Sequence, residues 1–269
     1  MSDLYFSSTL MWNNSLEEIF FKAYSEGFKG IELWMQHFDN INSSIEEVNR
    51  LKKKYPINLF IHAYSWDLNI SSLNDEIRNS SVNEIIKTIY FAKKIGASEI
   101  TVHPGRDTLP NSNSKTVEYL YNSLDLILST AKETEIKVSL EIMEKIPKES
   151  MTSLSKFKLL LKDNFKHFNY TLDIAHCDSI KEIDSYLNNP ESMKFITKFH
   201  ISNRKDNRYH TPLYDGDFNF TELLLKLAQY DIPLVIEGLC LSHDSITLNN
   251  NINFIKKIKE DILCQRKVR

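Results

Sequence analysis

The sequence predicts an α/β protein built as a single (β/α)8 barrel that spans residues 1–269. Three observations support this fold class. Eight short apolar runs recur along the chain, amphipathic segments separate them, and no proline- or glycine-rich linker divides the sequence. Strands that alternate with helices pair in parallel and are buried on both faces. Eight such units in about 250 residues are typical of a closed barrel. An open doubly wound sheet is the competitor, but no glycine-rich phosphate turn follows the first strand.

The eight expected strands are runs rich in apolar and β-branched residues, a composition typical of buried strands. In chain order they are LYFSSTL (4–10), GIELWM (30–35), INLFIHA (57–63), SEITVHP (98–104), KVSLEIM (137–143), YTLDIA (170–175), KFHIS (198–202) and PLVIEGL (233–239). The pattern carries no hairpin signal, so no antiparallel pair is expected.

Amphipathic helices are expected between the strands, because apolar residues recur there at three- and four-residue spacing. The clearest examples are residues 15–28, 81–96 and 116–134. Helix N-caps are expected at Ser15, in a capping box, and at Ser153, Asp217 and Asn250. Gly96 is expected to end the second of these helices.

Composition narrows the class of protein. Apolar residues make up 42% of the chain and charged residues 26%, without an apolar run long enough to cross a bilayer. The N-terminus lacks a secretory signal pattern. Cys177, Cys240 and Cys264 show no C-x-x-C spacing, which favours packing roles in a reducing cytoplasm. The net charge of −3 disfavours a protein-wide attraction to nucleic acid.

Side chains that can bind a metal stand near the ends of seven expected strands. They are Glu32, His62, His103, Glu141, Asp173, His200 and Glu237, and His176 and His210 follow in the next loops. The active site of a barrel lies at the carboxyl ends of its strands. Structural roles for these residues would scatter them along the strands and over both ends. Other histidines do not fit this pattern: His167 precedes its strand, and His37 and His243 are expected in rim loops.

The carboxylates within apolar runs are the most informative. Asp173 lies in TLDIAHC, Glu141 in VSLEIM and Glu237 in LVIEGL, where an unpartnered charge would be costly. Oxygen and imidazole donors without a thiolate suit Mn²⁺, Mg²⁺, Co²⁺, Fe²⁺ or Zn²⁺. We therefore expect Asp173 to meet a divalent metal, together with Glu141, His200 and Glu237. For Glu32, a structural role and a functional role both remain open.

The segments GFKGIELW and HTPLYDGDFNF, and the series Glu, Asp-x-x-His, His and Glu on strands five to eight, resemble the xylose isomerase-like TIM barrels. This superfamily includes sugar isomerases, ketose 3-epimerases, hydroxypyruvate isomerases and the endonuclease IV type of AP endonuclease. The resemblance covers nearly the whole chain. Its epimerase branch implies one divalent metal on Glu141, Asp173, His200 and Glu237, a sugar or sugar phosphate as substrate, and a homo-oligomer.

In that branch Glu141 and Glu237 would also be the acid/base pair of an enediolate mechanism, since a cation that polarises a carbonyl and an adjacent hydroxyl lowers the cost of removing the proton between them. His176 would contact substrate oxygens. This interpretation ranks first. A sugar-binding barrel without activity is a further possibility, but such a protein should have lost one of the two glutamates.

The alternative is an endonuclease IV-like phosphodiesterase, whose substrate would be nucleic acid. HAYSWDLNISS and ITVHPGR resemble strands three and four of that family. The resemblance implies a zinc on His62, His103 and Glu141, a second on the quartet of Glu141, Asp173, His200 and Glu237, and a third on His176 and His210. Arg208 stands where the third site requires an aspartate, and a guanidinium cannot ligate a cation.

Further residues are candidates for substrate binding. Arg204, Lys205 and Arg208 could bind a phosphate or carboxylate, or could be solvated loop charges. His210 joins this set of candidates. Trp12, Trp34 and Trp66 follow the first three strands, where they could stack on sugar C–H groups or pack loops against the rim.

Overall fold

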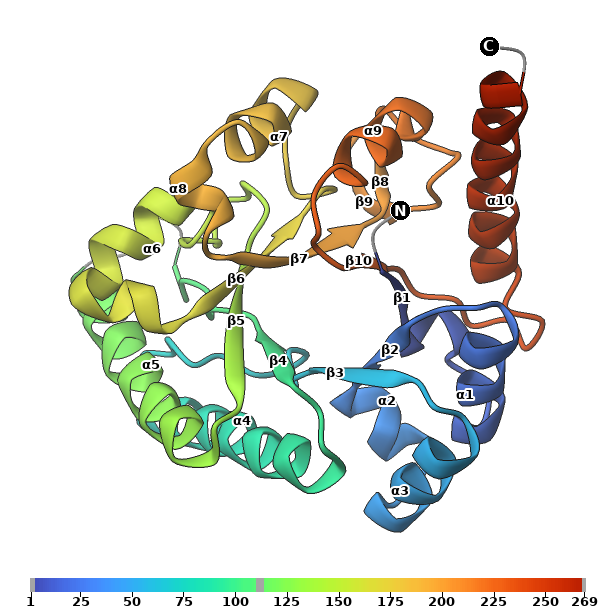
Figure 1. The fold of residues 1–269 in the computed structure, drawn as a ribbon. Coiled ribbons are helices and arrows are strands. Elements are labelled where there is room, and N and C mark those ends of the chain that lie inside the picture. The colour runs from blue at the N-terminus through green and yellow to red at the C-terminus, as the bar shows by residue number, and fades with distance from the viewer. Residues whose placement is uncertain (1–2, 110–113, 268–269) are drawn as a thin grey trace.

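The computed structural model describes residues 3–109 and 114–267. Eight parallel strands close a barrel in the order β1-β10-β7-β6-β5-β4-β3-β2, and helices surround it (Figure 1). The barrel strands are β1 (Leu4–Ser7), β2 (Gly30–Trp34), β3 (Asn58–His62), β4 (Glu99–Val102), β5 (Lys137–Ile142), β6 (Asn169–Asp173), β7 (Ile196–Ile201) and β10 (Leu234–Ile236). The predicted (β/α)8 barrel is confirmed, and each strand overlaps its expected run.

The helices form the outer layer of the molecule (Figure 1). They are α1 (Leu16–Ser25), α2 (Met35–Asn40), α3 (Ile45–Lys54), α4 (Asp75–Ile95), α5 (Ser114–Thr134), α6 (Leu154–Leu161), α7 (Ile180–Leu187), α8 (Pro190–Met193), α9 (Phe220–Leu227) and α10 (Ile246–Lys267). Two 3-10 helices, η1 (Ser8–Met11) and η2 (Lys162–His167), complete the set. None of the described helices combines the length and the apolar character that a membrane crossing requires.

The expected helix ends are correct at three of five positions. Ser15 forms the capping box with Glu18, Ser153 caps α6, and Gly96 ends α4 with a φ of +65° that glycine adopts without strain. The other two expectations are wrong. Asn250 lies inside α10, and Asn219 occupies the N-cap position of α9. Asp217 instead accepts a hydrogen bond from the backbone N–H of Asp206, so its carboxylate supports a neighbouring loop.

An antiparallel hairpin of β8 (Asn203–Lys205) and β9 (Arg208–Thr211) follows β7, which the sequence pattern did not predict. Asp206 and Asn207 connect the two strands, and Asp206 adopts a φ of +55°. Aspartate and asparagine tolerate this left-handed conformation better than other residues that carry a side chain. The strands are too short and polar to stand out as apolar runs. The hairpin carries Tyr209 and His210 to the barrel mouth.

Polar side chains lie inside the barrel beside a small aromatic layer. Tyr5 stacks on Phe60 with ring centroids 4.7 Å apart, and the ammonium of Lys198 lies 4.6 Å from the centre of the Phe60 ring. Lys198 is fully buried and pairs with Glu32 and Glu99. Buried charges are stable only when they are paired. This interior ion network lies directly beneath the residues that form the candidate site.

The described cysteines take no part in disulfides, because Cys177 and Cys240 are buried and unpaired. The side chain of Cys264 lies outside the described residues. His167 and His243 are exposed, and His167 is the last residue of η2.

The expectation that His37 lies in a rim loop is wrong. His37 is a fully buried residue of α2, its ring stacks on Trp12 at 4.8 Å, and its Nε2 donates to the backbone oxygen of Trp12 at 3.0 Å. Burial lowers the pKa of His37 to about 4, although the hydrogen bond to Trp12 opposes this shift. The chain folds with this imidazole neutral.

This buried histidine should make the protein less stable in mild acid. The unfolded chain takes up a proton near pH 6.5, while folded His37 stays neutral to about pH 4, so stability is lost as the pH falls through this window. Between pH 7 and 4.5 the free energy of unfolding should fall by about 2 kcal/mol less in His37→Phe, which retains the stacked ring, than in the wild type. Urea titrations at both pH values measure this difference. Equal pH dependence in the two proteins would contradict the assignment.

Candidate metal centre

The ends of four neighbouring strands meet at one mouth of the barrel. Asp173 at the end of β6 lies opposite His200 in the register of β6 and β7. Glu141 lies near the end of β5. Glu237 directly follows β10, where its backbone N–H donates to the oxygen of Ile201 on β7 at 3.1 Å. The parallel register therefore places the four sequence-predicted ligands side by side.

These four side chains converge. His200 Nδ1 lies 2.9 Å from Glu237 Oε2, 3.7 Å from Glu141 Oε2 and 3.9 Å from Asp173 Oδ2. One ligand atom from each residue lies within 4.8 Å of the other three. All four side chains are buried, with at most 6% exposed. This group is called the quartet below.

The donor atoms of the quartet fit a divalent cation. The four facing atoms are buried and make no hydrogen bond within the described part of the chain, and the 2.9 Å approach of Glu237 to His200 lacks hydrogen-bonding geometry. Three carboxylates in so small a space repel one another unless a positive charge lies between them. Carboxylate oxygens and an imidazole nitrogen suit Mn²⁺, Co²⁺, Fe²⁺, Zn²⁺ or Mg²⁺.

Asp173 has two oxygens with separate roles. Its Oδ1 accepts hydrogen bonds from the backbone N–H groups of Ala175 and His176, at 2.6 and 3.2 Å, and so fixes the turn after β6. Its Oδ2 faces the quartet without a hydrogen bond. Burial raises the pKa of Asp173 well above its usual value; the positive charge of His176 opposes this shift, while Glu237 and Glu141 add to it. A cation at the centre would favour the ionised form.

Glu32, for which two roles were open, does not belong to the quartet. Its Oε2 lies 2.9 Å from His200 Nε2, the ring nitrogen that faces away from the other members of the quartet. Its Oε1 lies 3.0 Å from Lys198 Nζ. Although burial alone would raise the pKa of Glu32, the charges of Lys198 and His200 hold it well below its usual value.

A second group contains the histidines of strands three and four. His62 Nε2 and His103 Nε2 lie 3.5 and 3.3 Å from Glu141 Oε2, and neither nitrogen makes a hydrogen bond within the described residues. The second nitrogen of His62, Nδ1, lies 2.9 Å from the backbone oxygen of Ala63. His62, His103 and Glu141 therefore offer three ligand atoms to a further cation.

A third group consists of Asp173, His176 and His210. His210 Nδ1 lies 3.8 Å from Asp173 Oδ2. In the sequence, Arg208 occupies the position of the expected third ligand. In the structure Arg208 is exposed on β9, and Asp173 supplies the carboxylate of this group.

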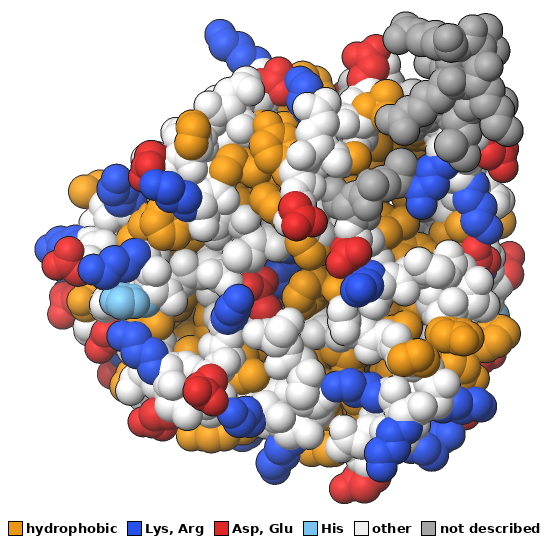
Figure 2. Space-filling model, in the orientation of Figure 1, with side chains coloured by type: hydrophobic (Ala, Val, Ile, Leu, Met, Phe, Trp, Pro, Cys, Tyr) orange, Lys and Arg blue, Asp and Glu red, His pale blue; other side chains and the backbone are white. Residues whose placement is uncertain are grey.

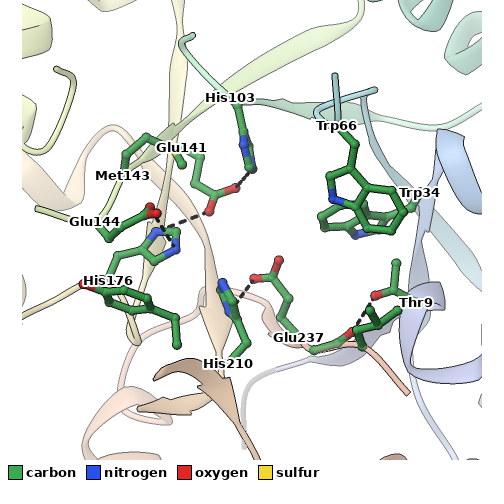
Figure 3. Close-up of a pocket in the computed structure, with 13 residues that line it drawn as sticks. Thr9, Trp34, Trp66, His103, Glu141, Met143, Glu144, His176, His210 and Glu237 are labelled. Carbon is green, nitrogen blue, oxygen red and sulfur yellow. Dashed lines mark hydrogen bonds and ion pairs between the residues drawn. The ribbon is translucent and has the colours of Figure 1, made fainter. Parts of the chain in front are cut away.

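A cavity of about 400 Å³ opens above the quartet (Figure 3). Figure 3 shows Glu141 and Glu237 pointing into it from different sides, with Trp34 and Trp66 standing together across from Glu144 and His176. The lining residues are Thr9, Trp34, Trp66, His103, Glu141, Met143, Glu144, His176, Tyr209, His210, Glu237, Gly238 and Leu239. Among the described residues that line this cavity there is no lysine or arginine.

The two candidate arginines point elsewhere. Arg204 Nη1 donates to the backbone oxygen of Cys177 at 2.8 Å, and its guanidinium lies 5.1 Å from the centre of the Tyr209 ring. Arg208 is exposed, and Lys205 pairs with Asp215 at 2.6 Å. Neither arginine lines the cavity, whereas the candidates His176, His210, Trp34 and Trp66 all do.

The aromatic wall is built of rings that pack on one another. Trp34 stacks on His62 at 3.7 Å and is 94% buried, and Trp66 lies 5.9 Å from Trp34 and 5.2 Å from Trp12. The Nε1 of Trp34 is buried without a hydrogen-bond partner among the described residues. This wall offers aromatic surface to a bound molecule.

Sequence reasoning missed Thr9, Met143, Glu144, Tyr209, Gly238 and Leu239 as lining residues. Glu144 lies three residues after Glu141, and its Oε2 is 3.5 Å from His176 Nε2. The position of Glu144 just after the end of a strand was the sequence signal that could have identified it as a lining residue. Tyr209 could not be placed without the unpredicted hairpin.

The profile of the xylose isomerase-like TIM barrel family matches residues 20–258, and the chain belongs to this family. A curated relative, an uncharacterized protein of Methanocaldococcus jannaschii, is 27% identical over 233 residues, which cover 83% of each chain. Among solved structures, a D-tagatose 3-epimerase-like protein superposes with a TM-score of 0.77 at 23% identity, covering 99% of this chain and 100% of the other. The 3-keto-D-glucoside 4-epimerase of E. coli gives 0.77 at 19% identity, covering 97% and 100%. At these identities the two structures establish the shared fold.

Proposed function

We propose that the protein is a divalent-metal-dependent isomerase or epimerase of a sugar, with Glu141 and Glu237 as both metal ligands and the acid/base pair. One observation carries this proposal: the quartet is buried at the floor of a cavity into which both glutamates point (Figure 3). The epimerases among the structural neighbours support the same reaction class.

The quartet residues Glu141, Asp173, His200 and Glu237 would hold the metal. When bound there, a divalent ion supplies a positive charge that polarises a carbonyl and an adjacent hydroxyl. One glutamate removes the proton from the carbon next to the carbonyl, which leaves an enediolate. In epimerisation the other glutamate delivers a proton to the same carbon from the opposite face. Exchange with water then returns each glutamate to its starting protonation state. Burial in a small cavity keeps the two carboxylates in fixed positions.

The cavity favours an unphosphorylated sugar. Three carboxylates, Glu141, Glu144 and Glu237, line it, and no cationic lysine or arginine of the described chain does. Arginine and lysine are common partners of a phosphate, and the arginines that sequence reasoning offered for this role bind backbone or face solvent. Trp34 and Trp66 instead present faces that suit the C–H groups of a sugar.

Proton exchange tests the reaction. The protein, loaded with Mn²⁺ or Co²⁺, is incubated in D₂O with a panel of free ketoses and their phosphates. We expect NMR to show loss of the proton at the reacting carbon, only with metal, and faster for a free ketose than for its phosphate. Absence of exchange across the panel with metal-loaded protein, or exchange that persists in EDTA, would refute the proposal.

A metal-dependent phosphodiesterase is the second candidate, and the two further groups favour it. His62 with His103, and His176 with His210, would extend the quartet to two or three cations. Metal analysis of the purified protein separates the candidates, because one metal per chain supports the isomerase and two or three support the hydrolase. Cleavage of a duplex with an abasic site at catalytic protein concentrations would establish the second candidate.

A further inference from the structure

His200 has two ring nitrogens, and the structure gives them different surroundings. Nδ1 faces the three carboxylates of the quartet. Nε2 lies 2.9 Å from Glu32 Oε2, an ion-pair distance without hydrogen-bonding geometry, and both side chains are fully buried. An imidazole that ligates through one nitrogen is commonly held through the other by a carboxylate, which fixes the ring orientation and the tautomer.

Glu32 is itself held by two contacts. Its Oε1 lies 3.0 Å from Lys198 Nζ and accepts a hydrogen bond from Thr101 Oγ1 at 2.6 Å. Lys198 Nζ also lies 2.6 Å from Thr101 Oγ1. These contacts join β2, β4 and β7 across the interior of the barrel, so the carboxylate of Glu32 cannot rotate away from His200 without breaking them.

The strand geometry explains how Lys198 reaches Glu32 beside His200. Lys198 and His200 are two residues apart on β7, so both side chains point to the same face, here the barrel interior. Lys198 also pairs with Glu99 at 3.2 Å, and Glu99 contacts Thr197 and Asn169 rather than His200. The ammonium therefore links one carboxylate that touches the quartet to another that does not.

We propose that Glu32, held by Lys198 and Thr101, is a positioning residue that orients His200 so that Nδ1 is its metal-binding atom. The inference rests on the metal centre proposed above. It assigns a role to an ion pair that lies below the cavity and touches no substrate. Loss of the Glu32 contact should leave His200 free to turn about its Cβ–Cγ bond and should weaken metal binding.

Metal affinity, rather than activity, is the test. The double variant Glu32→Leu/Lys198→Met removes both buried charges together, so that neither is left unpaired. Mn²⁺ binding followed by EPR of the free ion should show a dissociation constant about 10- to 100-fold higher than that of the wild type. Glu32→Gln keeps an acceptor for His200. It should therefore raise the dissociation constant for Mn²⁺ less than the double variant does, but by at least about 3-fold. The absorption bands of bound Co²⁺ should change in the double variant, because the nitrogen ligand is no longer fixed.

Glu99→Gln is the matched control, since it removes the other partner of Lys198 without touching His200. Its dissociation constant should match that of the wild type. A folded double variant with wild-type affinity, or an equal loss of affinity in Glu99→Gln, would overturn the inference. If the double variant does not fold, wild-type affinity in Glu32→Gln overturns it. Failure of the wild type to bind any divalent ion would refute the metal centre itself, whereas an active wild type with an unaffected Glu32 variant would refute this inference alone.

Discussion

Replacement of Glu237 by glutamine should lower turnover by about 10³-fold or more while the barrel remains folded. Glutamine has nearly the same shape and keeps one oxygen towards the quartet, but it cannot accept or return a proton. Loss of a positioned acid/base group alone costs about 10²- to 10⁴-fold. Although burial opposes ionisation, the positive charges of His200 and His210 hold the pKa of Glu237 well below its usual value, so the carboxylate is ionised in the folded protein.

The measurement is the rate of proton exchange or product formation with saturating metal, accompanied by circular dichroism for the fold. Glu144→Gln is the matched control, because Glu144 lines the same cavity and lies outside the quartet. Its kcat should stay within about 10-fold of the wild type, with the larger change in KM. Turnover by Glu237→Gln at the wild-type rate would remove Glu237 from the reaction.

Replacement of Asp173 should abolish metal binding. Asp173→Asn retains an oxygen for the hydrogen bonds to Ala175 and His176 but offers the quartet a neutral amide in place of Oδ2. We expect a loss of affinity for Mn²⁺ greater than about 100-fold, since replacement of residues that merely support a ligand already costs about 10- to 100-fold. The rise in melting temperature that metal causes in the wild type should disappear.

Asp173→Ala should show the same loss of metal and, in addition, a less stable turn after β6. The two lost hydrogen bonds should lower the free energy of unfolding by about 1–3 kcal/mol without metal. Asp178→Asn serves as the control, because Asp178 is exposed and pairs with Lys145 and Arg204. Its metal affinity should not change. Full occupancy in Asp173→Asn would show that Asp173 is not a ligand.

The fold could be predicted because its signal is repeated. Eight apolar runs alternate with helical segments, and each run such as 137–143 or 233–239 is recognisable by itself. The hairpin of residues 203–211 escaped prediction because its strands are short, polar and stabilised by their neighbours. Its turn at Asp206 is a local feature, but the pairing around it depends on Asn203 and Thr211.

The ligand candidates could be predicted because each sits at the end of a strand. Glu141, Asp173 and Glu237 lie among apolar residues where a carboxylate is costly, and that cost points to a partner. The environment of the basic residues could not be predicted. Arg204 and Arg208 both follow β7 in the sequence, yet one binds the backbone of Cys177 and the other faces solvent.

The surface charge does not single out a nucleic-acid site on the face that Figure 2 shows. Lysine and arginine side chains alternate there with acidic ones, and no broad patch of one sign covers it (Figure 2). The even mixture agrees with the net charge of −3. Interspersed charges of both signs give a weak long-range field.

The sequence by itself determined the closed barrel and the end of it at which acidic and imidazole groups collect, because strand periodicity and strand ends are local properties of the chain. Only the tertiary structure decided which atoms meet. The register between β6 and β7 brings Asp173 beside His200, and closure of the barrel brings Glu32 and Lys198, 166 positions apart, into contact beneath them. Such contacts depend on distances of a few ångströms between strands far apart in sequence, and no local pattern encodes those distances.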